Sequence, residues 1–289
     1  MYKKVTIAGM GLIGGSIGLA LKEKGLAEEV CGWGRNMERL KLALDKGACD
    51  TVTTDIKEAS AGMEILILAT PPEIIKMQLK DIKQYLEKGV LIMDVGSVKE
   101  SIVEAVEKEG VFNAGAEFLG CHPMAGSEKT GVANAQGAMF ENAPCIITPV
   151  DENTAEGIDK GKRFWEGLGA DIYVIGASEH DLMIGMVSHL PHVVSSVLTK
   201  SLTEKINDLK RVSNISGPSF KSMSRVAGSS PELWSQIYME NRKQVMQAIH
   251  TFLTELEKFN NMLSEKDIKG IKKYLEEASE SRNKIWPSE

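Results

Sequence analysis

Cysteine is scarce in this 289-residue sequence. Its four cysteines, Cys31, Cys49, Cys121 and Cys145, are scattered, with no CxxC pair and no spacing typical of metal ligands. Nothing in this distribution indicates a disulfide framework or a metal centre, and it is typical of reduced thiols in a cytoplasmic protein. We therefore expect a cytoplasmic location and no metal.

Long apolar runs and blocks of like charge are also missing. The longest apolar stretches are interrupted well short of the ~18–20 residues that a membrane span needs. The 40 acidic and 34 basic residues are spread along the chain and give a net charge of -6. We therefore expect neither a membrane nor a nucleic-acid partner. The chain is long enough for two domains, each with its own core.

The hydrophobic pattern changes near residue 175. Before it, short apolar runs alternate with helical patterns, which predicts a parallel sheet wrapped by helices. The expected strands cover residues 5–8, 30–33, 65–69, 90–94, 118–119, 145–148 and 172–175. The clearest helices there cover residues 13–23, 37–46 and 99–108. The sequence predicts an α/β domain over residues 1–175.

Residues 176–289 show 3.6-residue periodicity and no convincing strand, which predicts an all-helical domain. The expected helices cover residues 178–205, 218–226, 231–259 and 265–278. The apolar stripe of the 231–259 helix must be covered, either by neighbouring helices or by a second subunit.

A glycine motif joins the first expected strand to the first expected helix. Its sequence is Gly9-Met10-Gly11-Leu12-Ile13-Gly14. The first glycine allows a tight turn, the second lets the backbone approach a pyrophosphate, and the third lets helix and strand lie close together. This context predicts a dinucleotide cofactor, NAD or NADP, bound by Gly9, Gly11, Leu12, Ile13 and Gly14. The alternative is a glycine-rich turn without a nucleotide.

The end of the second expected strand bears on the choice between NAD and NADP. An acidic residue there would hold the ribose 2′-hydroxyl of NAD. This chain has Gly34 and Arg35 instead, and a guanidinium suits a 2′-phosphate. The charge logic favours NADP or use of both cofactors, unless Arg35 is only a solvated loop residue.

His122 is the candidate general base. It follows the short apolar run 118–119 and precedes Pro123, which predicts an imidazole held on a rigid loop. Ser97 opens the expected helix 99–108. It is either the N-cap of that helix or, at the carboxyl edge of the sheet, a hydroxyl that orients His122.

Two further pairs of residues share helical faces. His189 and His192 are three residues apart and flank Pro191, which must disturb the helix. They are either core residues or part of a site. Lys221 and Arg225 are four apart and suit a dianionic substrate, unless they form a solvated basic face. Trp234 is either a core residue or a pocket wall.

The order of these motifs resembles that of the prephenate dehydrogenases over nearly the whole chain. The matching blocks are the glycine motif, Asp94-Val95-Gly96-Ser97-Val98-Lys99, His122-Pro123-Met124-Ala125-Gly126-Ser127-Glu128, Ser188-His189-Leu190-Pro191-His192 and Lys221-x-x-x-Arg225. The resemblance implies a Rossmann-type domain followed by an all-α dimerisation domain, and a homodimer. It implies NAD(P)-dependent oxidative decarboxylation of prephenate to 4-hydroxyphenylpyruvate in tyrosine biosynthesis.

The resemblance also implies roles for single residues. His122 would take the proton of the substrate's ring hydroxyl, and Ser97 would orient His122. The residues implied to bind substrate are His192, Arg225, Lys221, His189, Ser127, Glu128 and Trp234. Thr70 and Pro71 would lie beside the dinucleotide, as would Gly34 and Arg35.

Three other functions remain open. An arogenate (cyclohexadienyl) dehydrogenase would act on a substrate whose side chain carries an amino group. A β-hydroxyacid dehydrogenase shares the plan of a Rossmann-type domain and helices but usually employs a lysine base. A dinucleotide-sensing protein would bind cofactor without turnover.

Overall fold

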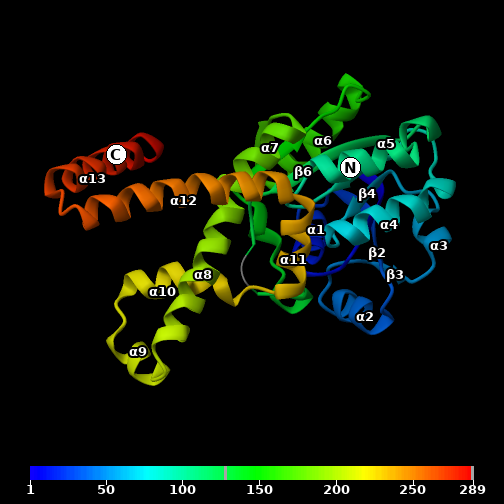
Figure 1. Cartoon of the computed structure of the whole chain (residues 1–289). Coiled ribbons are helices and arrows are strands. Elements are labelled where there is room, and N and C mark those ends of the chain that lie inside the picture. Colours follow the sequence, from blue (N-terminus) through cyan, green and yellow to red (C-terminus); the bar gives the residue numbers. More distant parts are fainter. Residues whose placement is uncertain (127–128, 288–289) are drawn as a thin grey trace. The chain divides into compact units, whose positions relative to one another are not determined.

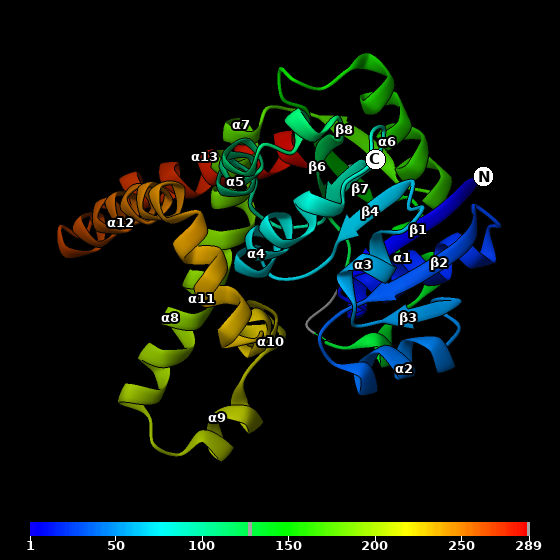
Figure 2. The same ribbon diagram turned by 90° about the vertical axis from the view of Figure 1, so that its right-hand side faces the viewer.

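A single eight-stranded sheet forms the framework of the N-terminal half. The computed structural model describes residues 1–126 and 129–287. The strand order is β3-β2-β1-β4-β5-β6-β7-β8. Figures 1 and 2 show the strands and the helices around them in two views. The strands are β1 (Tyr2–Ala8), β2 (Ala27–Trp33), β3 (Thr51–Thr53), β4 (Ile65–Leu68), β5 (Leu91–Asp94), β6 (Glu117–Pro123), β7 (Pro144–Thr148) and β8 (Asp171–Val174). Strands β1 to β6 are parallel, whereas β7 is antiparallel to β6 and β8 is parallel to β7.

Strand β4 shows why the sheet is buried on both faces. Ile65 and Ile67 belong to one apolar cluster and Leu66 and Leu68 to another, because successive side chains point to opposite faces. Helices α1 (Leu12–Glu23), α2 (Met37–Asp45) and α6 (Ala155–Leu168) contribute to the first cluster. Helices α3 (Ile56–Ser60), α4 (Pro72–Ile82) and α5 (Glu100–Glu109) contribute to the second. The predicted α/β sheet wrapped by helices is confirmed, with the short strand β3 and helices α3, α4 and α6 added. The expectation that the sheet is parallel is wrong at β7, which is antiparallel to β6.

The order of the strands reverses between β1 and β4. The chain runs from β1 outward through β2 to β3, then returns to β4 on the other side of β1. Ligands of open α/β sheets bind at the carboxyl ends of the strands at such a switch point. The ends of β1 and β4, with Ala8 paired to Leu68, therefore mark where to look for a site.

Helices alone follow β8 within the described residues. They are α7 (Ala177–Ile184), a π-helical segment η5 (Gly185–His189), α8 (Leu190–Lys205), α9 (Leu209–Ile215), α10 (Pro218–Ser224), a 3₁₀ turn η6 (Arg225–Gly228), α11 (Pro231–Glu240), α12 (Arg242–Ser264) and α13 (Ile268–Ile285). The disturbance expected from Pro191 is present as the π-helical segment directly before α8, where proline occupies the first turn.

The expected continuous helix over residues 231–259 is wrong. Asn241, with φ -106° and ψ 30°, separates α11 from α12. The Asn241 side chain donates to the Asp181 carbonyl oxygen at 2.8 Å and contacts Nδ1 of His189 at 3.1 Å. These tertiary hydrogen bonds have no signature in the apolar periodicity, which runs through the break unchanged.

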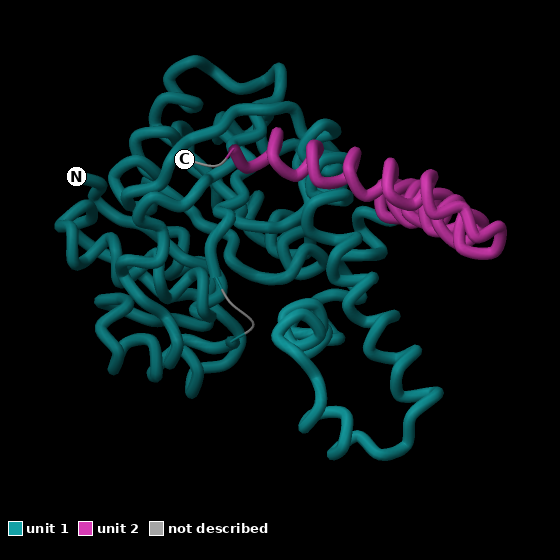
Figure 3. The backbone as a smooth tube through the Cα atoms, turned by 90° about the vertical axis from the view of Figure 1, so that its left-hand side faces the viewer, with its two compact units in different colours: residues 1–242 teal, residues 243–289 magenta. Residues whose placement is uncertain are grey.

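The boundary between the two compact units does not coincide with the end of the sheet. Residues 1–242 form one compact unit and residues 243–289 another (Figure 3). Helices α7 and α11 belong to the larger unit because polar contacts tie them to the α/β layers. Asp181 of α7 caps α5, and Glu240 of α11 pairs with Lys76 of α4 at 2.6 Å.

The smaller unit pairs α12 with α13. The rings of Phe259 and Tyr274 lie 5.6 Å apart, and the Tyr274 hydroxyl donates to Glu255 at 3.1 Å. Several large apolar side chains of both helices remain exposed, including Leu256 and Leu275. Within this unit, the pairing of α12 with α13 thus leaves part of the apolar stripe noted in the sequence exposed.

One expectation about apolar runs needs correction. The segment Ala177–Lys205 is long and apolar enough to cross a membrane, with a mean hydropathy of 1.4, by length and composition alone. Counting uninterrupted runs missed it because scattered polar residues break the run without lowering the average much. The polar residues His180, Asp181 and His189 within it are buried and hydrogen-bonded to the rest of the larger unit.

Candidate active site

The glycine motif forms a tight turn between β1 and α1. Gly9 has φ +96°, a conformation that residues with side chains rarely adopt. A Cβ on Gly14 would lie 2.1 Å from the Gly9 carbonyl oxygen, so only glycine allows α1 to approach the turn this closely. A Cβ on Gly11 would meet nothing within 4 Å. Gly11 therefore borders open space at the start of α1.

The N-terminus of α1 suits an anionic ligand. Gly11 provides no side-chain cap, and the first turn carries no acidic residue. The backbone N–H groups and the positive end of the helix dipole are thus available to a phosphate. These residues fit the pyrophosphate of a dinucleotide.

Two other segments border the glycine turn. A Cβ on Gly9 would lie 2.6 Å from both the Ala69 carbonyl oxygen and the Thr70 methyl group, so the end of β4 touches the turn. Thr70 also donates to Gln78 at 2.7 Å, and Pro71 precedes α4. A Cβ on Gly126, beyond β6, would lie 3.4 Å from the Ile13 side chain. Thr70, Ile13 and the segment after His122 thus lie at one edge of the sheet.

The end of β2 carries no acidic side chain at the position that reads the cofactor's ribose. Gly34 follows Trp33, and Arg35 is exposed. Asn36 caps α2 by accepting from the backbone N–H of Arg39 at 3.0 Å. Arg35 makes no ion pair with any residue that the structure describes, which leaves its guanidinium accessible to a ligand.

His122 lies within β6, not on a loop. The strand continues to Pro123 because its last residues pair with the antiparallel strand β7, where His122 is opposite Ile146. The expectation of a loop was wrong because two glycines and a proline nearby suggested a turn, and the pairing partner is distant in sequence. The imidazole is only 9% exposed, and the sheet holds its backbone in place.

A chain of polar contacts runs from His122 to the start of α5. Nδ1 of His122 lies 2.8 Å from Nε2 of His180, and Nδ1 of His180 lies 2.7 Å from Oδ1 of Asp181. The Asp181 carboxylate accepts from the backbone N–H groups of Lys99 and Glu100 at 2.8 and 2.9 Å. Asp181, not Ser97, therefore caps α5.

A buried ion pair fixes the backbone beside His122. Asp94 and Lys99 pair with both side chains fully buried. Asp94 also accepts from the Cys121 N–H at 3.3 Å, and Lys99 donates to the Cys121 carbonyl oxygen at 2.8 Å. Both backbone polar groups of the residue preceding His122 are thus held, which restrains the imidazole further.

Burial lowers the pKa of His122 well below the usual value for histidine. The neighbouring groups His180, Lys99 and His189 lower this pKa further by electrostatic repulsion of a proton. The imidazole is therefore neutral at pH 7 and able to accept a proton.

Ser97 lies between β5 and α5. The structure gives no hydrogen bond from it to His122 among the described residues, and its predicted orienting role stays a prediction. The predicted substrate residues Ser127 and Glu128 lie outside the described residues.

His189 belongs to a second hydrogen-bonded group. The Asn241 amide nitrogen contacts its Nδ1, while its Nε2 is buried and has no partner among the described residues. Burial lowers the pKa of His189 to about 4. The side chain is neutral at pH 7.

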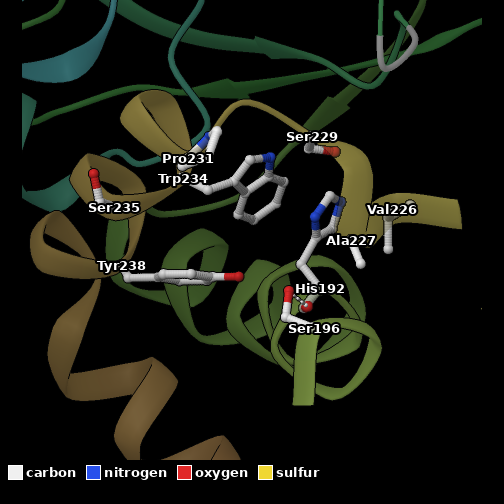
Figure 4. A pocket seen from close by; sticks show the side chains of 9 residues that line it. All are labelled: His192, Ser196, Val226, Ala227, Ser229, Pro231, Trp234, Ser235 and Tyr238. Carbon is white, nitrogen blue, oxygen red and sulfur yellow. Dashed lines mark hydrogen bonds between the residues drawn. The ribbon is translucent and has the colours of Figure 1, made fainter. Parts of the chain in front are cut away.

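His192 and Trp234 form an aromatic wall. Their rings are stacked with centroids 3.4 Å apart (Figure 4). The rings of Trp234 and His189 are nearly perpendicular, with centroids 5.8 Å apart. Burial, with the nearby charge of Arg225, lowers the pKa of His192 to about 4. The charge of Arg225 thus acts on His192. Lys221 is exposed on α10.

A cavity of about 260 Å³ adjoins this wall. It is lined by His192, Ser196, Val226, Ala227, Ser229, Pro231, Trp234, Ser235 and Tyr238. His122 is not among these residues, so the cavity adjoins the wall of rings and does not enclose His122.

Two family models cover most of the chain. The nucleotide-binding domain of prephenate dehydrogenase matches residues 17–174, and its dimerization domain matches residues 176–277. The chain belongs to the prephenate dehydrogenase family. Members are dehydrogenases that use a nucleotide cofactor.

Individual relatives agree with this assignment. The prephenate dehydrogenase of Bacillus subtilis is 30% identical over 288 residues, which cover 98% of this chain and 76% of the relative. The structure of the A. aeolicus prephenate dehydrogenase, solved with hydroxyphenyl propionate and NAD+, superimposes with a TM-score of 0.91 at 29% identity, covering 99% of both chains. The structure of the Synechocystis arogenate dehydrogenase superimposes with a TM-score of 0.82 at 27% identity, covering 98% of this chain and 99% of the Synechocystis chain.

The sequence did not single out His180 or Asn241, and Asp181 was read only as part of a helix start with Ser178, whereas the N-cap of α7 is Gly176. His180 and Asp181 are adjacent at the start of a helix, where a polar pair is ordinarily solvated. The available signal was the small number of histidines, five in all, but only the packing of α7 against α5 reveals the hydrogen bonds.

Proposed function

We propose that this member of the prephenate dehydrogenase family oxidises and decarboxylates prephenate to 4-hydroxyphenylpyruvate. The observation that carries the proposal is the neutral, buried His122 at the carboxyl end of β6, from which the chain continues to Gly126 beside Ile13 of α1. Geometry and pKa both suit a general base acting on a substrate that lies between this edge and the wall of rings.

His122 begins the reaction by removing the proton of the ring hydroxyl at C4. NAD(P), when bound, accepts the hydride that leaves C4. As C4 becomes a carbonyl, the carboxylate at C1 departs as carbon dioxide, and its electron pair makes the ring aromatic. The chain then has only to hold the substrate, orient the base and receive the proton.

Arg225 is proposed to bind a substrate carboxylate, with His192 and Lys221 nearby. Its charge is close enough to His192 to lower that residue's pKa, and guanidinium binds carboxylate well. Trp234 would form the wall against the substrate ring, and His189 would offer its buried Nε2. Ser127 and Glu128 are retained as predicted pocket residues.

The cofactor would lie on the turn formed by Gly9, Gly11 and Gly14, with Leu12, Ile13, Thr70, Pro71 and Gly34 beside it. The NAD+ in the A. aeolicus relative supports NAD. The exposed Arg35 and the missing acidic residue at Gly34 support NADP, so we propose that both are used.

We further propose a cytoplasmic homodimer formed through the C-terminal helices. The matching family domain is named for dimerization, and exposed apolar side chains on α12 and α13 would be covered by a second copy.

Arogenate is the alternative substrate, favoured by the similarity to the Synechocystis enzyme. Steady-state rates with prephenate and arogenate, each with NAD+ and NADP+, test both substrate and cofactor. We expect prephenate to give the highest kcat/KM, with carbon dioxide and 4-hydroxyphenylpyruvate formed in equal amounts. Cofactor binding without turnover of either compound would contradict the proposal and favour a dinucleotide-sensing protein.

A further inference from the structure

The hydrogen-bond partners of His180 determine which of its nitrogens carries a proton. The Asp181 carboxylate can only accept, so Nδ1 of His180, 2.7 Å away, must be the donor. Both Asp181 oxygens also accept backbone N–H groups at the start of α5, where the helix dipole favours a negative charge. Both carboxylate oxygens of Asp181, which is only 1% exposed, are thus occupied as acceptors.

The contact between the two histidines then has one consistent direction. Neutral His180 with a proton on Nδ1 has a bare Nε2, which accepts a hydrogen bond. Nδ1 of His122, 2.8 Å away, is the donor. His122 therefore carries its proton on Nδ1, and its Nε2 has a free lone pair.

We propose that His180, held by Asp181, is a positioning residue that sets the tautomer of the base His122. This inference rests on the proposed function of His122. Without the acceptor at His180, His122 can place its proton on Nε2, where it cannot remove a proton from substrate. The backbone at the start of α5 thus orients His122 through the side chains of Asp181 and His180.

The other groups around His122 also support a hydrogen bond donated by His122 to His180. Three ionisable groups act on His122: His180 of α7, Lys99 directly before α5, and His189 of η5. Lys99 donates to Asp94 and to the Cys121 carbonyl oxygen. Nδ1 of His189 contacts the Asn241 amide. Of these groups, only His180 offers the Nδ1 atom of His122 an acceptor in the described structure.

Two substitutions at His180 distinguish its role as a hydrogen-bond acceptor from a role in packing alone. His180→Leu fills much of the space but offers no acceptor, whereas His180→Gln retains one acceptor and one donor. We expect His180→Leu to lower kcat about tenfold to a hundredfold, as for loss of other partners that orient histidines. KM should change by less than about twofold, and His180→Gln should retain most of the activity. His250→Gln, on the exposed surface of α12, is the matched control.

The tautomer itself is measured by ¹⁵N NMR of ¹⁵N-histidine-labelled protein without substrate. The five histidines are assigned with single variants. We expect Nδ1 of His122 to be protonated and Nε2 bare in the wild type and in His180→Gln, with mixed tautomers in His180→Leu. A wild-type His122 protonated on Nε2 would overturn the proposal, as would unchanged kcat in His180→Leu or equal losses in the two variants.

The NMR result is independent of turnover. If the wild type fails to oxidise prephenate, the proposed function fails while the spectrum still decides the tautomer. If His180→Leu does not fold, the wild-type spectrum alone is decisive.

Discussion

The glycine turn is proposed to allow close packing of α1 at Gly14 and to leave room for a phosphate at Gly11. The substitutions Gly14→Ala and Gly11→Ala should test these two roles separately. A Cβ on Gly14 would lie 2.1 Å from the Gly9 carbonyl oxygen, against a shortest tolerable distance of 3.0 Å. Helix α1 must therefore shift by roughly 1 Å, and overpacking of this kind costs about 1–3 kcal/mol. At about 2–4 °C per kcal/mol for a protein of this size, Tm should fall by about 2–12 °C.

Gly11→Ala is the matched variant because its Cβ would meet no protein atom within 4 Å. A small loss of N-cap preference should be offset by the reduced entropy of the unfolded chain, so Tm should stay near the wild-type value. Its methyl group would occupy the space proposed for the pyrophosphate. We expect cofactor Kd to rise at least about tenfold, or about 1.4 kcal/mol.

Thermal unfolding without cofactor and fluorescence titration with NAD+ and NADP+ measure the two effects. Gly14→Ala should lower Tm and weaken both cofactors, whereas Gly11→Ala should weaken binding alone. A Gly11→Ala variant with normal Kd would refute the placement of the cofactor. A Gly14→Ala variant with normal Tm and Kd would refute the tight approach of α1 to the turn.

Three further substitutions or conditions have defined outcomes. Arg225→Ala should raise KM for prephenate about tenfold to a hundredfold with little change in kcat, as expected when a charged hydrogen bond is lost; an unchanged KM would place the carboxylate elsewhere. Arg35→Ala should raise the Kd of NADP+ more than that of NAD+, and equal effects would mean that Arg35 does not contact the phosphate. The free energy of unfolding should decrease as pH falls from about 6.5 towards 4, because His189 and His192, whose folded pKa values are lowered to about 4, bind fewer protons than the unfolded chain does in this window. His192→Gln should flatten that decrease in urea titrations, and an unchanged slope would contradict the lowered pKa.

The alternating sheet was predictable because its strands are short apolar runs between helical patterns. β4, with all four residues buried, reads clearly in the sequence. The three-residue strand β3 does not, since only Thr53 of its three side chains is buried. The glycine turn was also predictable, because the spacing of Gly9, Gly11 and Gly14 reflects local backbone needs.

Contacts between distant segments were not predictable. The extension of β6 through His122 depends on pairing with β7, and the helix break at Asn241 depends on hydrogen bonds to Asp181 and His189. The partner of His122 lies 58 residues away in sequence. Residue types pointed to His122 as the candidate base, but only the fold shows that its imidazole contacts His180.

The pH dependence of kcat/KM for prephenate tests the central claim that His122 is the general base. Because burial lowers its pKa in the free enzyme, we predict a rate independent of pH between about 6.5 and 8. Below the lowered pKa, the rate should fall tenfold per pH unit. His122→Asn should lower kcat at least about a hundredfold, leave cofactor Kd unchanged and abolish the acidic limb. An acidic limb that persists in His122→Asn, or near-normal turnover of that variant, would contradict the account.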